Sequence, residues 1–392
     1  MFSVWSSPNP VLFGCGSSKT IGEQLVKNGC KKVIVIYDKG VKAAGIADKI
    51  LKYINDAGIE TVCYEDVQSD PPDWSINEAA ALAIAQGVDG VVGVGGGSSM
   101  DTAKGVDVLL SNEPPINRYF ARPSMPPAGD LTSLKPLIVI PTTSGTGSEV
   151  TPGGAVTDTE NNTKENFVCP VTLGIIDPEL TLSLPSSVTA ATAFDALCHA
   201  IEAVVSNEPN KFSELFGSRA ITLISKYLPV ACRDGSNLEA REGLMLAATM
   251  ASMSILGPYC NIPHDVGVVI GVMFHMPHGV AVSAVLPEAV EFVAQAVPDK
   301  VRLVAECLGA DIPDGAGSEE IGRAAGRAIR KLMDDCGLPR IKSFVESREE
   351  FLSAVPMIMD TQNFHFSPRP VTATDITEML SKAYSADLAR PE

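Results

Sequence analysis

Short apolar runs and amphipathic stretches alternate along the first half of the chain. Runs rich in β-branched residues predict strands at 33–37, 61–65, 89–95 and 136–140. Helical patterns separate these runs at 42–57, at 74–86 and from the glycines near 96 to about Leu110. Continuous apolar strands separated by helices are typical of a parallel sheet that is covered on both faces. We therefore expect an α/β domain with a doubly wound, mostly parallel sheet.

The pattern changes at about residue 186, after which helical periodicity dominates. The expected helices are 187–206, 212–230, 236–256, 279–294, 297–308, 317–336 and 374–384. The segment DPELTLSLP (177–185) lies at this change and ends in a proline, which favours a break there. We predict two domains, an α/β domain over 1–185 and an all-helical domain over 186–392. The run 266–287 carries no Asp, Glu, Lys or Arg, but its histidines, proline and glycines favour a buried core segment over a membrane span.

The charge balance narrows the classes of partner. The chain has 30 basic and 47 acidic residues, a net charge of −17, and no cluster of Lys and Arg. Nucleic acids and anionic membrane surfaces bind through such clusters, so we expect neither as a partner. The nine cysteines include no CxxC pair and the start shows no signal peptide, which indicates reduced thiols in the cytoplasm. The strand-like start SVWSSPNPVLFG is suited to pair across a subunit edge, so we expect a homodimer or higher homo-oligomer.

A glycine-rich segment, GVGGGSSMDTAK (93–104), follows a predicted strand and opens a predicted helix. Glycines let the backbone approach a pyrophosphate, and a helix N-terminus offers free N–H groups to its charge. The acidic residue that ends a strand, Asp38, precedes these glycines, whereas the usual G-x-G-x-x-G fingerprint has it about twenty residues downstream. On this motif alone, a tight strand–helix turn without a ligand is an equally good interpretation.

A second polar loop strengthens the dinucleotide interpretation. PTTSGTGSE (141–149) follows the strand at 136–140 and supplies hydroxyl groups and glycines at the carboxyl end of that strand, where open α/β sheets bind ligands. We expect the two loops to converge. A carboxylate at Asp38 suits a ribose diol and repels a 2′-phosphate, which favours NAD over NADP. A solvated strand-end carboxylate remains the alternative for Asp38.

Histidines are scarce, and three of the five lie in two compact segments with one carboxylate. Asp195 and His199 are four residues apart in a helical pattern and share one face. His264 and His278 are fourteen residues apart. A set of one Asp and three His suits Fe(II), Zn(II) or another divalent metal. The alternatives are an ordinary helix pair for Asp195 and His199, and a capping or core role for the other histidines.

Over residues 10–385 the sequence resembles the iron-dependent (group III) alcohol dehydrogenases. The resemblance lies in GGGSSMDTAK, IPTTSGTGSEVT, IIDPELTLSLP, FDALCHAIEA, the histidine pair with PHG, and SPRPVTATDI. It implies an N-terminal dinucleotide-binding domain, an all-α C-terminal metal-binding domain, and a metal and substrate in the cleft between them. It implies that the metal ligands are Asp195, His199, His264 and His278.

The resemblance and the loop positions also give the expected contacts of the cofactor and substrate. For NAD(H) these are Asp38, Gly95, Gly96, Gly97, Ser98, Asp101, Thr142, Thr143, Ser144, Thr146, Lys164 and Leu182. For the substrate they are Thr151, Pro152, Tyr259, His275, Asn363 and Phe364.

One position departs from the family pattern. Family members commonly carry another histidine four residues after the third ligand, and here Val268 stands at that place. The proton relay that this histidine serves is therefore rerouted or absent. Either His275 takes over as the catalytic histidine, or it is only a polar residue beside the metal loop. His365 has no expected role.

The resemblance implies hydride transfer between the nicotinamide C4 and a small primary alcohol or aldehyde held at a divalent metal. Three alternatives remain open. One is a metal-dependent, NAD-using synthase or lyase of the dehydroquinate-synthase type. The others are a metal-free reductase of the maleylacetate type and a catalytically silent binding protein, which the valine at 268 favours.

Overall fold

A computed structural model describes residue 6 and residues 9–121, 129–208, 210–362 and 364–389. Contacts divide the chain into two compact units, Ser7–Ser183 and a second unit that contains Leu184–Glu392. This division falls two residues before the predicted domain boundary at 185/186.

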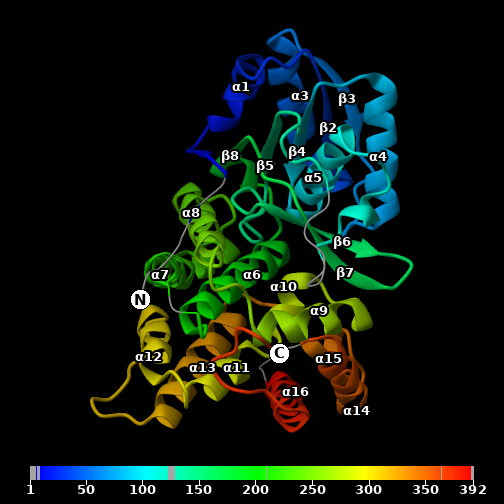
Figure 1. The fold of residues 1–392 in the computed structure, drawn as a ribbon. Coiled ribbons are helices and arrows are strands. Elements are labelled where there is room, and N and C mark those ends of the chain that lie inside the picture. Colours follow the sequence, from blue (N-terminus) through cyan, green and yellow to red (C-terminus); the bar gives the residue numbers. More distant parts are fainter. Residues whose placement is uncertain (1–5, 7–8, 122–128, 209, 363, 390–392) are drawn as a thin grey trace. The chain divides into compact units, whose positions relative to one another are not determined.

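The first unit is built on a six-stranded sheet in the order β1-β8-β5-β4-β2-β3, in which every neighbouring pair is parallel (Figure 1). The strands are β1 (Val11–Phe13), β2 (Lys32–Tyr37), β3 (Glu60–Tyr64), β4 (Gly90–Gly95), β5 (Leu137–Pro141) and β8 (Leu173–Ile176). The strand order reverses between β2 and β4, as in a doubly wound sheet. Strand β1 pairs with β8 and is an edge strand of this sheet, so the expected pairing of the start of the chain across a subunit edge stays a prediction; residues 1–5 and 7–8 lie outside the described residues.

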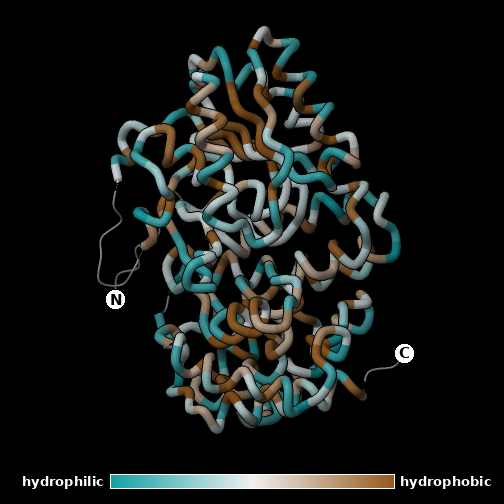
Figure 2. The backbone as a smooth tube through the Cα atoms, turned by 90° about the vertical axis from the view of Figure 1, so that its right-hand side faces the viewer, coloured by the Kyte–Doolittle hydropathy of each residue, from teal (hydrophilic) through white to brown (hydrophobic). Residues whose placement is uncertain are grey.

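Successive side chains of each central strand enter different cores. In β2, Val33 and Val35 pack on one face while Ile34 and Ile36 pack on the other, and all four are fully buried. The helices of this unit are α1 (Ile21–Lys27), α2 (Lys39–Ala43), α3 (Ile46–Asp56), α4 (Asp73–Gln86) and α5 (Gly97–Ser111), with 3₁₀ turns η1 (Ser17–Thr20), η2 (Ile116–Tyr119) and η3 (Pro178–Thr181). Apolar side chains of α1 and α3 join the first core, and those of α4 and α5 join the second. Figure 2 shows these strands as hydrophobic segments. Burial on both faces explains the continuous apolar runs.

An antiparallel hairpin of β6 (Gly153–Asp158) and β7 (Thr163–Val168) also belongs to this unit. It was not predicted, because β6 carries two glycines and is only half-buried by alternation, and β7 is mostly polar with one buried residue. Strand β8 was missed as well. Its run of four residues is short and stands directly before DPELTLSLP.

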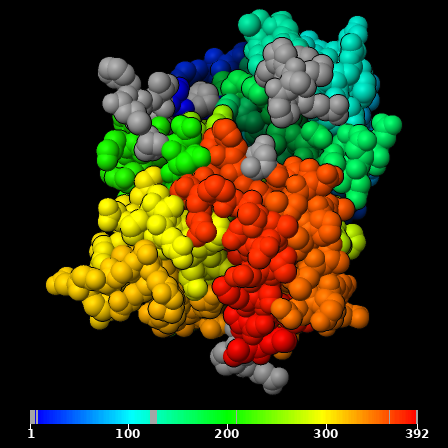
Figure 3. All heavy atoms as spheres, turned by 60° about the horizontal axis from the view of Figure 1, so that its bottom comes forward, coloured from blue at the N-terminus to red at the C-terminus, as the bar shows by residue number. Residues whose placement is uncertain are grey.

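The second unit is helical throughout its described residues. It contains α6 (Ser186–Val205), α7 (Lys211–Arg233), α8 (Leu238–Ser254), α9 (Ile262–Phe274), α10 (His278–Ser283), α11 (Leu286–Val293), α12 (Pro298–Cys307), α13 (Ser318–Asp335), η4 (Ile341–Ser343), α14 (Arg348–Leu352), α15 (Val355–Thr361) and α16 (Ala373–Leu388). One large apolar cluster joins these helices. The C-terminal helix α16 is red in Figure 3 and packs beside α14 and α15.

One expected helix of this unit differs in the structure, and α9, α14 and α15 were not among the expected helices. The helix expected at 279–294 is two helices, α10 and α11, separated at residues 284–285. The apolar run at 266–287 is a buried segment, as expected, and forms most of α9 and all of α10. Of the described helices, α6 alone has the length and hydropathy of a membrane span, but 83% of its most apolar window is buried inside the structure, as in a core helix.

Candidate metal centre and cofactor loops

Helix α6 carries a row of buried polar side chains within an otherwise apolar sequence. Asp195, His199 and Glu202 are 2%, 7% and 1% exposed. Their spacing of four and three residues places them on neighbouring turns of one helix face. Three buried polar groups in a core helix carry a large desolvation cost, so each needs a partner.

Helix α10 approaches α6 very closely at Gly279. A Cβ added at Gly279 would lie 1.9 Å from the backbone oxygen of Ala191 on α6. Gly267 has the same role between α9 and α10, because its Cβ would meet Val282 Cα at 2.5 Å. These two glycines let three helices pack backbone against backbone. The close packing brings His278, the first residue of α10, to the row on α6.

Three histidine nitrogens converge on one carboxylate oxygen. Asp195 Oδ1 lies 3.7 Å from His199 Nε2, 3.4 Å from His264 Nε2 and 3.5 Å from His278 Nε2. Among the described residues, Asp195 Oδ1, His199 Nδ1 and His264 Nε2 are buried and have no hydrogen-bond partner. Buried polar atoms in native proteins are nearly always paired, so this convergence is the arrangement of a site that holds an ion.

Glu202 fixes the orientation of His264. Its Oε1 accepts hydrogen bonds from the backbone N–H groups of Asn261 (2.8 Å) and His264 (3.1 Å), and its Oε2 pairs with His264 Nδ1. A carboxylate can only accept, so Nδ1 of His264 carries the proton and Nε2 presents its lone pair toward Asp195. Carboxylates play this orienting role behind many metal-binding histidines.

The charges of the centre suit a divalent cation. Burial opposes the charge of Asp195, but His199, His278 and His264 outweigh that effect and lower the pKa of the carboxyl. When the histidines give up their protons to bind a metal, Asp195 and Glu202 together supply two buried negative charges. One carboxylate oxygen and three imidazole nitrogens are a donor set for iron or zinc, so the residues present fit such an ion.

In the α/β unit, the expected cofactor loops lie at the carboxyl ends of three adjacent strands. Asp38 follows β2, Gly96 follows β4 and Thr142 follows β5. The sheet order reverses between β2 and β4, and ligands of open α/β sheets bind outside such a point. The backbone N–H of Thr142 donates to the carbonyl of Gly95 at 2.9 Å.

The two loops touch, as the sequence predicted. A Cβ added at Gly97 would lie 2.7 Å from Thr146 Cγ2, and one at Gly96 would lie 3.5 Å from Thr143 Oγ1. Gly95 has a φ of +148° and faces Ser99 at 2.4 Å from an added Cβ. Gly95 and Gly97 therefore leave no room for side chains, and they keep the N-terminus of α5 open between the loops.

Asp38 has structural partners as well as its expected role. Its Oδ1 accepts from the N–H of Val41 at 2.9 Å and caps α2, and its Oδ2 accepts from Ser99 Oγ at 3.3 Å. These bonds hold the carboxylate beside the glycine loop. The orientation is consistent with recognition of a ribose at the adenosine end.

Lys104 braces the second loop from within the core. The side chain is fully buried on α5, and its Nζ donates to the carbonyls of Ser148 (2.7 Å), Thr151 (3.1 Å) and Gly153 (2.5 Å). It also donates to Ser148 Oγ at 2.7 Å. Burial lowers the pKa of the Lys104 ammonium, with the opposing charge of Asp101 3.9 Å away. The loop that follows β5 is therefore fixed by a side chain of α5.

Comparison with known proteins defines the family. Residues 8–178 match the family model described as iron-containing alcohol dehydrogenase, and residues 189–384 match the C-terminal model of the same family. The chain belongs to the iron-containing alcohol dehydrogenase family. These matches confirm the resemblance and favour the dehydrogenase over the synthase and lyase alternatives. Enzymes of this family interconvert alcohols and aldehydes, and so does this chain.

Individual family relatives cover nearly the whole chain. A choline dehydrogenase of Bacillus subtilis (strain 168) is 34% identical over 344 residues, covering 87% of this chain and 85% of the relative. The NAD-dependent methanol dehydrogenase of Bacillus methanolicus is 29% identical over 381 residues, covering 96% and 98%. A crystal structure of 1,3-propanediol oxidoreductase is 30% identical with a TM-score of 0.90, covering 98% and 100%. The fold class predicted from sequence is confirmed.

Two expected cofactor contacts of this alcohol dehydrogenase, Asp101 and Lys164, have other partners, and a third, Leu182, is exposed. Asp101 accepts from Ser148 Oγ at 2.6 Å and from the N–H of Ala155 at 3.0 Å. Lys164, on β7, pairs with Asp70 at 2.7 Å. Leu182 ends η3 and is 36% exposed. Asp101 therefore helps to hold the loop together, and direct cofactor contact by these three residues stays a prediction.

The expected substrate residues belong to different parts of the chain. His275 is exposed and ends α9 in a left-handed conformation, with a φ of +52°. It is not among the side chains whose ligand atoms cluster around Asp195. Tyr259 is 61% exposed and lies 5.1 Å from the ring of Phe366, whereas Thr151 belongs to the α/β unit. Asn363 lies outside the described residues.

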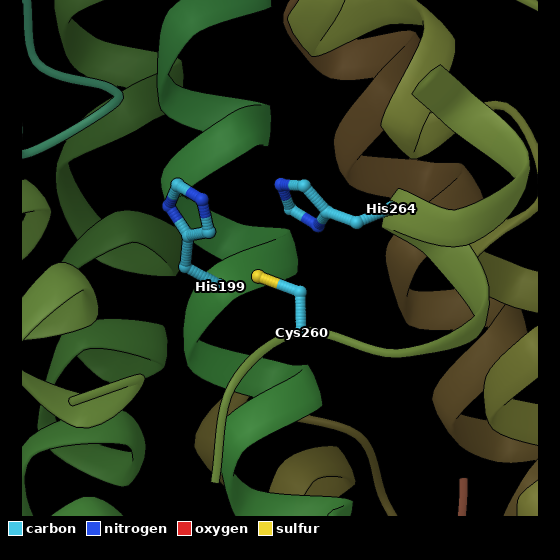
Figure 4. Close-up of side chains that lie close together, drawn as sticks. All are labelled: His199, Cys260 and His264. Atoms are coloured by element: carbon cyan, nitrogen blue, oxygen red, sulfur yellow. The ribbon is translucent and has the colours of Figure 1, made fainter. Parts of the chain in front are cut away.

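Sequence reasoning missed two side chains of the metal centre. Glu202 lies three residues after His199 inside FDALCHAIEA, and the i, i+3 spacing was a usable signal. Cys260 gave no signal, because it precedes α9 in a loop whose path the sequence does not fix. In Figure 4 its sulfur lies beside the rings of His199 and His264.

Proposed function

We propose that the chain interconverts a small primary alcohol and its aldehyde with NAD(H), using a divalent metal, iron by family, held by Asp195, His199, His264 and His278. The observation that carries the proposal is the convergence of three histidine nitrogens on Asp195 Oδ1, with buried atoms left unpaired. The methanol dehydrogenase relative is named NAD-dependent, which supports the choice of cofactor.

The helical unit supplies the metal position. When bound, the metal polarises the oxygen of the substrate as a Lewis acid. Asp195 contributes the negative charge, and the three histidines contribute neutral nitrogen donors. Glu202 holds the proton of His264 on Nδ1, which keeps Nε2 available. The backbone contacts at Gly279 and Gly267 hold the three helices at the spacing that this donor set needs.

The α/β unit supplies the cofactor position. Nicotinamide C4 accepts or gives the hydride when NAD(H) is bound. The N–H groups at the start of α5 face a pyrophosphate, and Gly95, Gly96 and Gly97 allow its close approach. Asp38 accepts hydrogen bonds from the ribose diol. Lys104 keeps the opposing threonine-rich loop in place.

The deciding experiment is a His264→Ala substitution with three readouts. We expect the purified variant to lose bound metal and to lose activity by about 10³-fold or more, since several kcal/mol of stabilisation come from the metal. NADH binding, followed by nicotinamide fluorescence, stays within about twofold because its contacts lie elsewhere. The matched control is His365→Ala, which removes an exposed histidine and leaves metal and activity unchanged. Full activity in a metal-free His264→Ala protein overturns the proposal.

His275 is the proposed replacement for the histidine that Val268 displaces. A His275→Ala variant should lower kcat and shift its pH profile, while metal content stays unchanged. An unchanged pH profile assigns His275 only the role of ending α9.

We also infer that the protein forms a homo-oligomer, with β1 at the subunit edge. The support is that β1 is an edge strand, with Val11 36% exposed. Light scattering after size exclusion tests this inference, and a mass of one chain at micromolar concentration overturns it.

A cytoplasmic location is likewise proposed. Each of the nine cysteines lies in the described residues, and none of them forms a disulfide, as is usual in reducing compartments. Fractionation of the native cell with an antibody against the chain tests the location, and recovery outside the cytoplasm overturns it.

A further inference from the structure

Cys260 is a ligand-type side chain beside the metal centre that the proposed function does not use. It stands two residues before α9 and is partly buried. The ligand atoms of His199, Cys260 and His264 all lie within 4.8 Å of one another. Two donors on one tetrahedral zinc ion lie about 3.6 Å apart, so binding brings the Cys260 sulfur and the two ring nitrogens closer together.

The two histidines have nitrogens available for this set. Glu202 pairs with Nδ1 of His264, which leaves Nε2 as the metal-binding atom. His199 directs Nε2 toward Asp195, whereas its Nδ1 is buried without a hydrogen-bond partner among the described residues. The two rings are stacked, with centroids 4.6 Å apart and an interplanar angle of 17°. Figure 4 shows the sulfur of Cys260 below and between them.

We propose that His199, Cys260 and His264 form a second metal position, which takes a thiophilic divalent ion such as Zn(II). The proposal rests on the proposed function only in that both positions use His199 and His264. For that reason the two positions are filled one at a time. Binding of the ion displaces the thiol proton to solvent, forms the metal–sulfur bond, and neither oxidises nor reduces any group.

The choice between the two positions follows from the softness of the donors. The position near Asp195 offers an oxygen and three nitrogens, which suit iron and zinc alike. The position at Cys260 replaces the oxygen of Asp195 and the nitrogen of His278 with one thiolate, which favours zinc over Fe(II). Zinc bound there occupies the shared histidines and excludes iron, so zinc should inhibit the iron-loaded enzyme.

Cobalt provides a direct readout, because a Co(II)–thiolate bond gives a strong near-ultraviolet charge-transfer absorption. The experiment adds one equivalent of Co(II), without oxygen, to the metal-free full-length protein. We expect this absorption in the unsubstituted protein and a stronger one in the Asp195→Asn variant, where the competing position is weakened. The Cys260→Ser and Cys260→Ala variants should lose it. Zinc inhibition of the iron-loaded enzyme should be lost in the same two variants.

A matched control and two separable failures complete the test. Cys307→Ser removes another partly buried cysteine of the helical unit and should keep the absorption. Bound cobalt with only d–d bands, in the unsubstituted protein and in Asp195→Asn, overturns the second position and leaves the proposed function intact. Absence of bound cobalt in every variant overturns both proposals. Circular dichroism of each variant confirms that it is folded.

Discussion

The two units of the chain differ in whether their buried charged groups have hydrogen-bond partners. In the helical unit, Asp195 and three histidines face one another at 3.4–3.7 Å with buried atoms left unpaired. In the α/β unit, Lys104 is equally buried, yet its ammonium donates to four oxygen atoms of one loop. The unpaired groups of the metal centre need a partner from outside the chain. The ammonium of Lys104, by contrast, finds all of its hydrogen-bond partners within the chain.

This difference separates a binding site from a structural brace. An unpaired buried group costs about 1–3 kcal/mol, so the metal centre lowers the stability of the metal-free protein. A saturated group stabilises the fold and gains little from a ligand. Substitutions in the metal centre should therefore mainly change metal binding, whereas substitutions of Lys104 should mainly change folding stability.

Asp195→Asn should produce the largest effect on metal binding. The substitution removes the charge on which the histidines converge, so metal affinity should fall by more than about 100-fold. At pH 8 the metal-free variant should lose some stability, because the histidines lower the pKa of the Asp195 carboxyl and its charge therefore favours the folded state, but the loss should be smaller than that of Lys104→Met. Chelator competition measures the affinity, and chemical denaturation measures the stability. A large loss of metal-free stability contradicts the comparison.

Lys104→Met should act on the fold. It removes a donor from the carbonyls of Ser148, Thr151 and Gly153, of which Thr151 keeps Asn9 Nδ2 at 2.9 Å. We expect a loss of about 2 kcal/mol or more in the free energy of unfolding. Chemical denaturation of the metal-free protein measures it. Lys52→Met, on the exposed surface of the same unit, should cost less than about 0.5 kcal/mol. Equal losses of unfolding free energy in the two variants argue against a stabilising role of Lys104.

Glu202→Gln should weaken the metal centre without destroying it. The amide still accepts from the backbone of α9, but its neutral oxygen orients and polarises His264 less. Metal affinity should fall by about 10- to 100-fold. The same competition assay measures this, with the exposed Glu378→Gln as control. Unchanged affinity indicates that Glu202 only supports the start of α9.

Asp107→Asn should have the smallest effect, and it should depend on pH. Burial raises the pKa of Asp107 to about 7, while an unfolded aspartate titrates near pH 3.9. Between these values the folded protein binds more protons, so its free energy of unfolding falls as pH rises from about 4 to about 7. The variant lacks this loss and should be more stable than the unsubstituted protein by about 1–3 kcal/mol at pH 8, with little difference at pH 4. Denaturation at both pH values measures it, and a constant difference contradicts the assignment.

The sequence predicted what depends on local periodicity. Strand β2 and helix α6 agree with the expected ranges to within one residue at each end, because their apolar patterns are continuous. The convergence of Asp195 with the three histidines was also predicted, since residue type and scarcity limited the choice.

What the sequence did not predict depends on tertiary contacts. The hairpin β6–β7 has a polar pattern that only its packing makes strand-like. The position of Cys260 depends on how α9 returns to α6, and no local pattern records that path. The partners of Asp101 across the loop likewise require the folded chain.

The contact at Gly279 has a consequence for how the ion is selected. Since a single added carbon would lie 1.9 Å from the backbone of α6, even alanine forces α10 to slide outward and carries His278 with it. The distance between His278 and the ligands on α6 is therefore determined by how closely α10 packs on α6, and not by the rotamer of His278. A shift of about an ångström there would change the distance between His278 and the other three ligand side chains. The size of the ion that fits best therefore depends on the glycine at position 279, because an alanine there would hold the two helices farther apart.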